Sequence, residues 1–140
     1  MSSRNLTFVI GHPALDADHQ MIVELWRSLE ATKTEDSARN VAARLMDLTL
    51  GHFSREEDFM RQCGFPLLEA HRNHHRALAS ELRRVILGPV MGGGRDDLVG
   101  AVCVLMNRWV SHILVEDARI APYAKAHARQ MTKAPARRAG

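Results

Sequence analysis

The sequence predicts an all-α protein: an antiparallel up-down-up-down four-helix bundle with an N-terminal arm and a basic C-terminal tail. Four stretches of helix length repeat apolar residues at the spacing of one helix face. Glycine and proline mark two of the three turns between them, and no stretch shows a convincing strand pattern. With 140 residues and 46% hydrophobic content, the chain is long enough for one domain with its own core.

The first helix is expected over residues 13–30, because Pro13 suits a first turn. The second is expected over residues 36–62, capped by Thr34 or Asp36. Ahead of them, residues 1–12 form an arm in which apolar residues alternate, so that one side can lie on the bundle; these residues are Leu6, Phe8 and Ile10.

The third helix is expected over residues 66–87, after a corner in which Gly64 takes the left-handed position and Pro66 the first turn. Residues 88–95 form a glycine-rich loop. The fourth helix then begins near Asp96 or Asp97, since acidic residues favour a helix N-terminus.

Basic charge is concentrated at the end of the chain. Residues 125–140 hold five of the 19 Lys and Arg residues and no acid, which leaves 14 basic against 16 acidic residues in 1–124. We therefore divide the chain into a bundle domain, 1–124, and a tail, 125–140, that we expect to be a solvated, frayed terminus. No basic stripe with interleaved aromatics indicates nucleic-acid binding, whereas a protein partner at the tail stays an open alternative.

The sequence also narrows the cellular location of the protein. The apolar run from Leu6 to Ile10 is too short for a signal peptide, and no unbroken apolar run has the length of a membrane span. Two cysteines make neither a disulfide framework nor a zinc motif. We expect a cytoplasmic protein.

The inner faces of the predicted helices carry histidines and acids that could converge. Residues four apart share one helix face, as His52 and Glu56 do, and as His71 and His75 do. His74 competes with His75, which we prefer because it continues the apolar stripe. His19, His112 and one acid complete the set, and spacing leaves Glu116 and Asp117 open. A buried carboxylate is costly unless paired or metal-bound, so this pattern indicates a metal site.

The sequence resembles the hemerythrin family, specifically its single-domain bacterial members. The resemblance covers residues 8–123 and rests on four motifs in order: Asp16-Ala17-Asp18-His19-Gln20, His52-Phe53-Ser54-Arg55-Glu56-Glu57, His71 with His75, and Trp109-Val110-Ser111-His112-Ile113 followed by Asp117.

The resemblance implies a non-haem centre of two iron ions with an oxo or hydroxo bridge. His71, His75 and His112 would hold one iron, His19 and His52 the other, and Glu56 and Asp117 would bridge them. Asp117 lies five residues after His112, off its helix face, so we expect a π-bulge or an unwound last turn there, with Glu116 turned to solvent or to Arg119.

Counting ligands around two octahedral ions leaves one open position, on the iron of His19 and His52. Reversible dioxygen binding for storage or delivery is the function that we expect. An apolar pocket would exclude water from it, with candidate residues Ile22, Val23, Leu48, Trp109 and Ile113. Two alternatives stay open: an oxygen, redox or nitric oxide sensor acting through a partner, and a di-iron enzyme that handles peroxide or nitric oxide.

Overall fold

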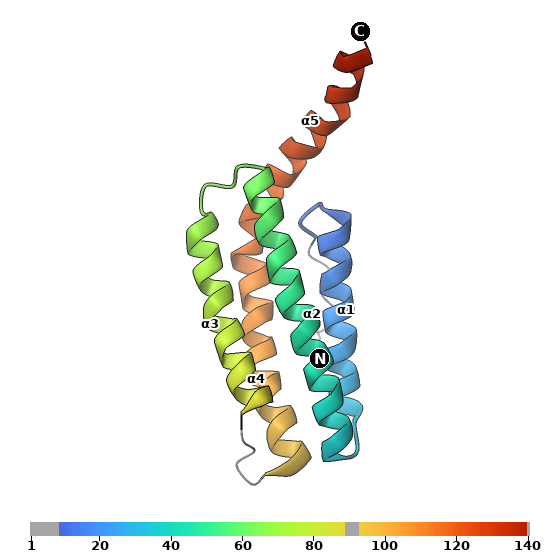
Figure 1. Cartoon of the computed structure of the whole chain (residues 1–140), viewed down its shortest axis with the longest axis vertical. Helices are drawn as coiled ribbons and strands as arrows, with labels where there is room; N and C mark the ends of the chain where they lie inside the picture. The colour runs from blue at the N-terminus through green and yellow to red at the C-terminus, as the bar shows by residue number, and fades with distance from the viewer. Residues whose placement is uncertain (1–8, 89–92, 140) are drawn as a thin grey trace.

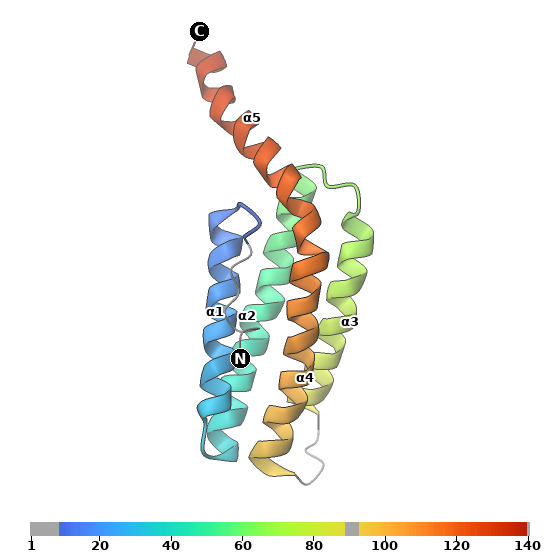
Figure 2. The ribbon, with the colours of Figure 1, turned by 180° about the vertical axis from the view of Figure 1, so that it is seen from behind.

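Four antiparallel helices form the bundle in the computed structural model, which describes residues 9–88 and 93–139, with side chains up to residue 132 (Figure 1). Each helix packs on its sequence neighbour, and α4 closes the bundle by packing on α1. A 3₁₀ turn, η2, then leads into a fifth helix that passes beyond the end of the bundle, as both ribbon views show (Figure 2). The elements are α1 Pro13–Ala31, α2 Glu35–Gln62, α3 Leu68–Leu87, α4 Gly94–Val115, η2 Asp117–Ile120 and α5 Ala121–Ala139. The predicted all-α bundle is confirmed.

Local signals set the helix starts. Pro13 opens α1, as predicted, and the His12 ring caps it by accepting a hydrogen bond from the Leu15 backbone N–H at 3.3 Å. Of the two predicted caps for α2, Thr34 is the one used, since its hydroxyl accepts from Ser37 N–H at 3.1 Å. Ile10 of the arm is buried, whereas Leu6 and Phe8 lie outside the described residues.

The corner between α2 and α3 uses a glycine as predicted. Gly64 has φ +70°, and the next residue, Phe65, donates its N–H to Met60 C=O at 2.9 Å, which closes the end of α2. The helix after the corner begins at Leu68, two residues later than predicted. The fourth helix begins at Gly94, two or three residues earlier than predicted, with Asp96 and Asp97 in its first turn.

The tail is helical over residues 125–139, where we expected a frayed terminus, and most of its described side chains are exposed to solvent. The tail lies within α5, because the chain resumes helical structure after η2 and the start of α5 packs on the bundle. Tyr123 meets Phe65 edge-to-face at 5.3 Å, His127 meets Phe59 at 5.6 Å, and Ala124 is buried. The proposed domain boundary at 124/125 falls inside this helix.

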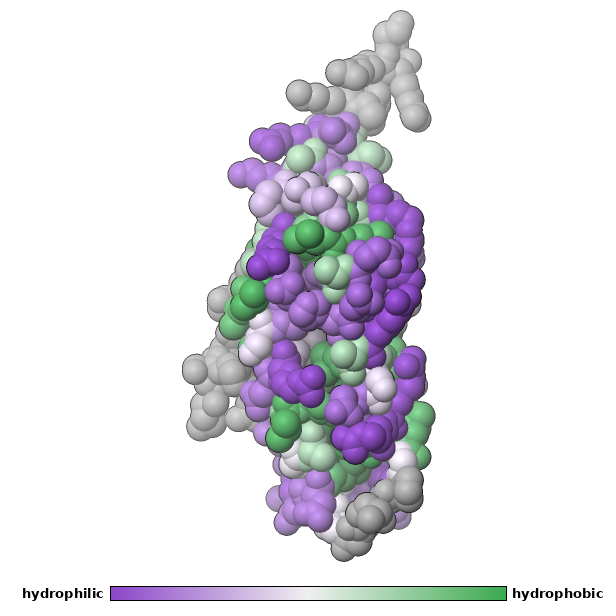
Figure 3. Space-filling view, turned by 90° about the vertical axis from the view of Figure 1, so that its left-hand side faces the viewer, coloured by the Kyte–Doolittle hydropathy of each residue, from purple (hydrophilic) through white to green (hydrophobic). Residues whose placement is uncertain are grey.

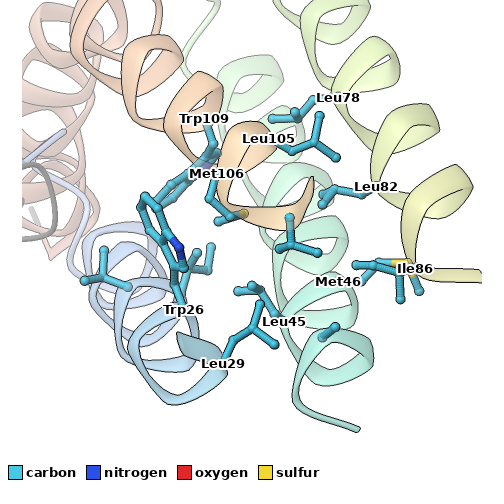
Figure 4. Packing of buried hydrophobic residues seen from close by; sticks show 14 of the residues in the cluster. Trp26, Leu29, Leu45, Met46, Leu78, Leu82, Ile86, Leu105, Met106 and Trp109 are labelled. Atoms are coloured by element: carbon cyan, nitrogen blue, oxygen red, sulfur yellow. The ribbon is translucent and has the colours of Figure 1, made fainter. Parts of the chain in front are cut away.

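Buried apolar residues form two separate clusters. The main cluster fills the bundle between all four helices and includes Trp26, Leu45, Leu82 and Met106, whose side chains point toward one another in Figure 4. The end cluster lies near the corner and η2; its buried residues are Ile10, Leu15, Phe59, Met60, Phe65, Ile120 and Ala124. Outside, the face shown in Figure 3 is mostly hydrophilic, with small separate hydrophobic areas.

One described stretch, Gly94–Thr132, is long and apolar enough by length and composition to cross a membrane. It contains α4, whose residues Val102, Met106 and Ile113 are completely buried in the main cluster. Core helices of bundles commonly have this composition, so the described residues contain no clear membrane span.

Candidate metal centre

A layer of polar side chains separates the two apolar clusters, and every helix of the bundle contributes to it. On each chain segment the polar residues lie between a residue of the end cluster and one of the main cluster: His19 lies between Leu15 and Ile22, and His71 and His75 lie between Leu68 and Leu78. We call these seven side chains the polar layer: His19, His52, Glu56, His71, His75, His112 and Asp117.

The polar layer is almost inaccessible to water. Glu56, His19 and His52 are fully buried, Asp117 is 1% exposed, and the most exposed of the seven side chains, His112, shows only 8%. Burial of this many polar groups costs free energy unless each finds a partner. The arrangement therefore needs a cation or a complete hydrogen-bond network.

Glu56 presents one oxygen to each of two sets of histidines. Its Oε1 lies 2.8 Å from His71 Nε2 and 3.1 Å from His75 Nε2, whereas its Oε2 lies 3.3 Å from His52 Nε2. A carboxylate placed in this way can hold two ions at once, one through each oxygen.

Asp117 divides its oxygens in the same way. Its Oδ1 lies 2.9 Å from His71 Nε2 and 3.0 Å from His112 Nε2, and its Oδ2 lies 3.5 Å from His19 Nε2. The seven side chains thus form two groups that share both carboxylates: Glu56, His71, His75, His112 and Asp117 in one, His19, His52, Glu56 and Asp117 in the other.

Several of these close atoms are not paired by hydrogen bonds. His75 Nε2, Glu56 Oε2 and both Asp117 oxygens are buried with no hydrogen-bond partner among the described residues. The Nε2 atoms of His19 and His52 lie 3.1 Å apart, as do those of His71 and His112. Two ligands about 2.1 Å from one ion at a right angle are about 3 Å apart. The residues therefore fit metal ions better than a closed hydrogen-bond network.

The electrostatics also favour cations. Burial alone would raise the pKa of Glu56, but the imidazole rings of His52, His71 and His75 close to its oxygens hold that pKa well below its usual range. Burial alone would lower the pKa of His71, but Asp117 and Glu56 raise it to about 9. Metal ions compete with protons for such ligands, so ions entering the layer would release protons.

The end of α4 is distorted where Asp117 joins the layer. The α-helix ends at Val115 and tightens into the 3₁₀ turn η2, so the chain is irregular at the expected place, but by tightening and not by a π-bulge or an unwound turn. Glu116 turns away from the layer, and its Oε1 lies 3.9 Å from both Arg119 Nη1 and His74 Nε2. Spacing alone could not choose between the two acids, and this turn places Asp117 in the layer.

The other histidines lie elsewhere: His12 caps α1, the side chain of His74 is 53% exposed, and His127 packs on Phe59. Of the predicted pocket residues, four are buried in the main cluster and Leu48 is partly buried against it. The Trp109 ring meets the His19 ring edge-to-face at 5.7 Å, so this part of the cluster borders the layer on the side of His19.

A family model described as the Hemerythrin HHE cation binding domain matches residues 11–124. This chain belongs to the hemerythrin family. A bacteriohemerythrin of Stenotrophomonas maltophilia (strain R551-3) is 27% identical over 128 residues, which are 89% of this chain and 82% of that protein. One of Pseudomonas aeruginosa (strain LESB58) is 30% identical over 112 residues, 77% of this chain and 71% of that protein. No solved structure matches the chain.

Sequence reasoning missed two acidic residues that lie behind histidines of the polar layer. Asp18 and Glu57 each accept a hydrogen bond from a histidine of the layer, at 3.0 Å from His52 and 2.7 Å from His75. Both acids stand next to a layer residue in the chain, which is the signal that could have found them. Their partners lie on other helices, and the sequence does not reveal these.

Proposed function

We propose that this hemerythrin-family chain holds two iron ions and binds dioxygen reversibly, for storage or delivery. The observation that carries the proposal is the division of Glu56 and Asp117 between two histidine sets, one oxygen to each. His71, His75 and His112 would hold one ion, and His19 and His52 the other. An oxo or hydroxo bridge would complete the pair.

The ligand chemistry supports a pair of iron ions. Imidazole suits iron, and carboxylates bridge such ions well. A structural zinc site would instead be closed by four ligands. Two ferrous ions would supply the electrons that dioxygen takes up when it binds and returns when it leaves.

The surroundings of His19 support binding over turnover. The set of His19 and His52 has one histidine fewer than the set of His71, His75 and His112. We therefore assign the open position to the ion that His19 and His52 would hold. Ile22, Ile113 and Trp109 are completely buried and keep water out of this side of the layer. Exclusion of water slows loss of electrons from the reduced pair. Val23 and Leu48 complete the proposed pocket.

Elemental analysis and an optical spectrum test the proposal. The purified protein should contain about two iron atoms per chain, and its anaerobically reduced form should gain a ligand-to-iron charge-transfer band in air and lose it again when oxygen is removed. Fewer than two irons, or oxidation that oxygen removal does not reverse, would refute reversible binding.

Sensing through a partner is the second candidate, and α5 favours it. This helix extends past the bundle (Figure 1). Its Lys125 and Arg129 are exposed and fit an acidic surface. Hydrogen exchange of α5 in the reduced and oxygenated protein separates the two functions, because a sensor changes α5 whereas a carrier leaves it unchanged. A cytoplasmic location stays a prediction, which cell fractionation would test.

A further inference from the structure

Two carboxylates lie behind histidines of the polar layer, on the side away from the proposed ions. Asp18 on α1 accepts from His52 Nδ1 at 3.0 Å, and Glu57 on α2 accepts from His75 Nδ1 at 2.7 Å. An ionised carboxylate can only accept, so each histidine carries its proton on Nδ1. That tautomer leaves the Nε2 lone pair free to face the layer.

Each carboxylate is in turn held by an arginine. Arg55 Nε donates to Asp18 Oδ2 at 2.9 Å, and Arg72 Nε lies 3.4 Å from Glu57 Oε1. The side chains of Asp18 and Glu57 are only 11% and 21% exposed, so solvent competes weakly for them. The two arrangements join different pairs of helices, α1 with α2 in one and α2 with α3 in the other.

We propose that Asp18 and Glu57 are positioning residues, one for each ion of the pair. Asp18 fixes the ring of His52, which belongs to the two-histidine set, and Glu57 fixes the ring of His75, which belongs to the three-histidine set. The inference rests on the proposed di-iron centre and adds that retention of each ion is governed by its own carboxylate.

Chelator-driven iron release from the full-length protein tests the proposal. In Asp18→Ala, one iron per chain should leave about ten- to a hundredfold faster than in the unsubstituted protein, while the other leaves at the normal rate. Glu57→Ala should release the other ion faster, and the Mössbauer spectrum of the remaining iron identifies which one was lost. Asp18→Asn and Glu57→Gln keep an acceptor oxygen and should restore most of the retention.

Proton NMR of the iron-loaded protein supplies a readout that a merely structural role would not change. The ring N–H protons of His52 and His75 are shifted by the nearby ions, and a carboxylate partner slows their exchange with solvent. Each should exchange faster only in the alanine variant of its own carboxylate. Asp58→Ala is the matched control, because Asp58 follows Glu57 on α2, is 68% exposed and pairs with Arg61 at 3.2 Å.

Unchanged release and exchange in both alanine variants would overturn the positioning role. Equal loss of both irons in every variant, Asp58→Ala included, would also overturn it, since that result shows general loosening of the bundle. Failure of the proposed function is distinguishable, because it appears in the unsubstituted protein as fewer than two irons or irreversible oxidation.

Discussion

At the scale of single residues, His74 and His75 show how one position around a helix separates two roles. Their side chains point about 100° apart. His75 is buried in the polar layer, whereas His74 is half exposed beside Glu116. The apolar stripe of α3 was enough to prefer His75 from sequence, because a side chain between buried leucines must itself face inward.

Replacing these two histidines should therefore have different results. His75→Ala removes a proposed ligand and should lower the iron content from about two atoms per chain to one or fewer, and His52→Ala should do the same from the other set. His74→Ala should keep both atoms. Elemental analysis measures the iron content of each variant. Equal iron loss in His74→Ala and His75→Ala would show that the choice of His75 over His74 was wrong.

The proposed pocket gives a second prediction at this scale. Ile22→Ala and Ile113→Ala would each leave a cavity beside the polar layer and should speed autoxidation, because water would then reach the proposed open position. Each should also cost about 2–5 kcal/mol of stability as a buried large-to-small change.

Leu82→Ala is the control for these variants, since Leu82 is equally buried but lies toward the opposite end of α3 from His71 and His75. Urea unfolding of this variant should show a similar loss of stability, whereas its autoxidation, followed by optical absorbance, should be no faster than in the unsubstituted protein. Autoxidation at the normal rate in both isoleucine variants would place the pocket elsewhere.

At the scale of elements, the junction between α4 and α5 decides which acid joins the layer. A regular helix would favour Glu116, only about 40° around from His112. The 3₁₀ turn from Asp117 to Ile120 changes this order, and Ile120 is completely buried in the end cluster. Packing of Ile120 therefore accompanies the turn, which is a tertiary effect that helical periodicity does not contain.

The two acids should respond differently to removal of charge. Asp117→Asn should weaken the proposed bridge to both ions and reduce the iron content to well below two atoms per chain. Glu116→Gln changes only contacts of 3.9 Å with Arg119 and His74 and should leave iron content and the spectrum unchanged. Iron loss in Glu116→Gln with retention in Asp117→Asn would reverse the assignment.

Sequence reasoning predicted the elements well where local chemistry decides them. Gly64 in the left-handed region and Pro13 at the start of α1 are local features that the sequence predicted, and Thr34 is one of the two caps that it offered for α2. The helical form of the tail was missed because composition alone indicated a frayed terminus, whereas His127 of the tail packs on Phe59, a residue distant in the chain. The pairing of Asp18 with His52 was missed for the same reason.

At the scale of the whole molecule, metal and fold are coupled through the polar layer. All four bundle helices supply ligand candidates, so an ion pair would tie them together at one level. Without ions, buried carboxylates and imidazoles face one another with unpaired atoms. Binding free energy at such a site adds to folding free energy.

Iron removal should accordingly lower the thermal midpoint by many degrees while the chain stays helical at low temperature. Circular dichroism of the loaded and chelator-treated protein measures both effects. Re-addition of ferrous iron under anaerobic conditions should restore the midpoint. An identical midpoint with and without iron would show that the layer is held by the protein groups alone.

The position of the polar layer between two apolar clusters has a consequence for divergence of the family. Side chains of the main cluster and the end cluster pack in different places, so substitutions in one need no compensation in the other. Residues of the main cluster and of the end cluster can then be substituted independently, while the polar layer between them keeps its ligand side chains. An identity of only 27% to the Stenotrophomonas protein over most of both chains is what such freedom allows.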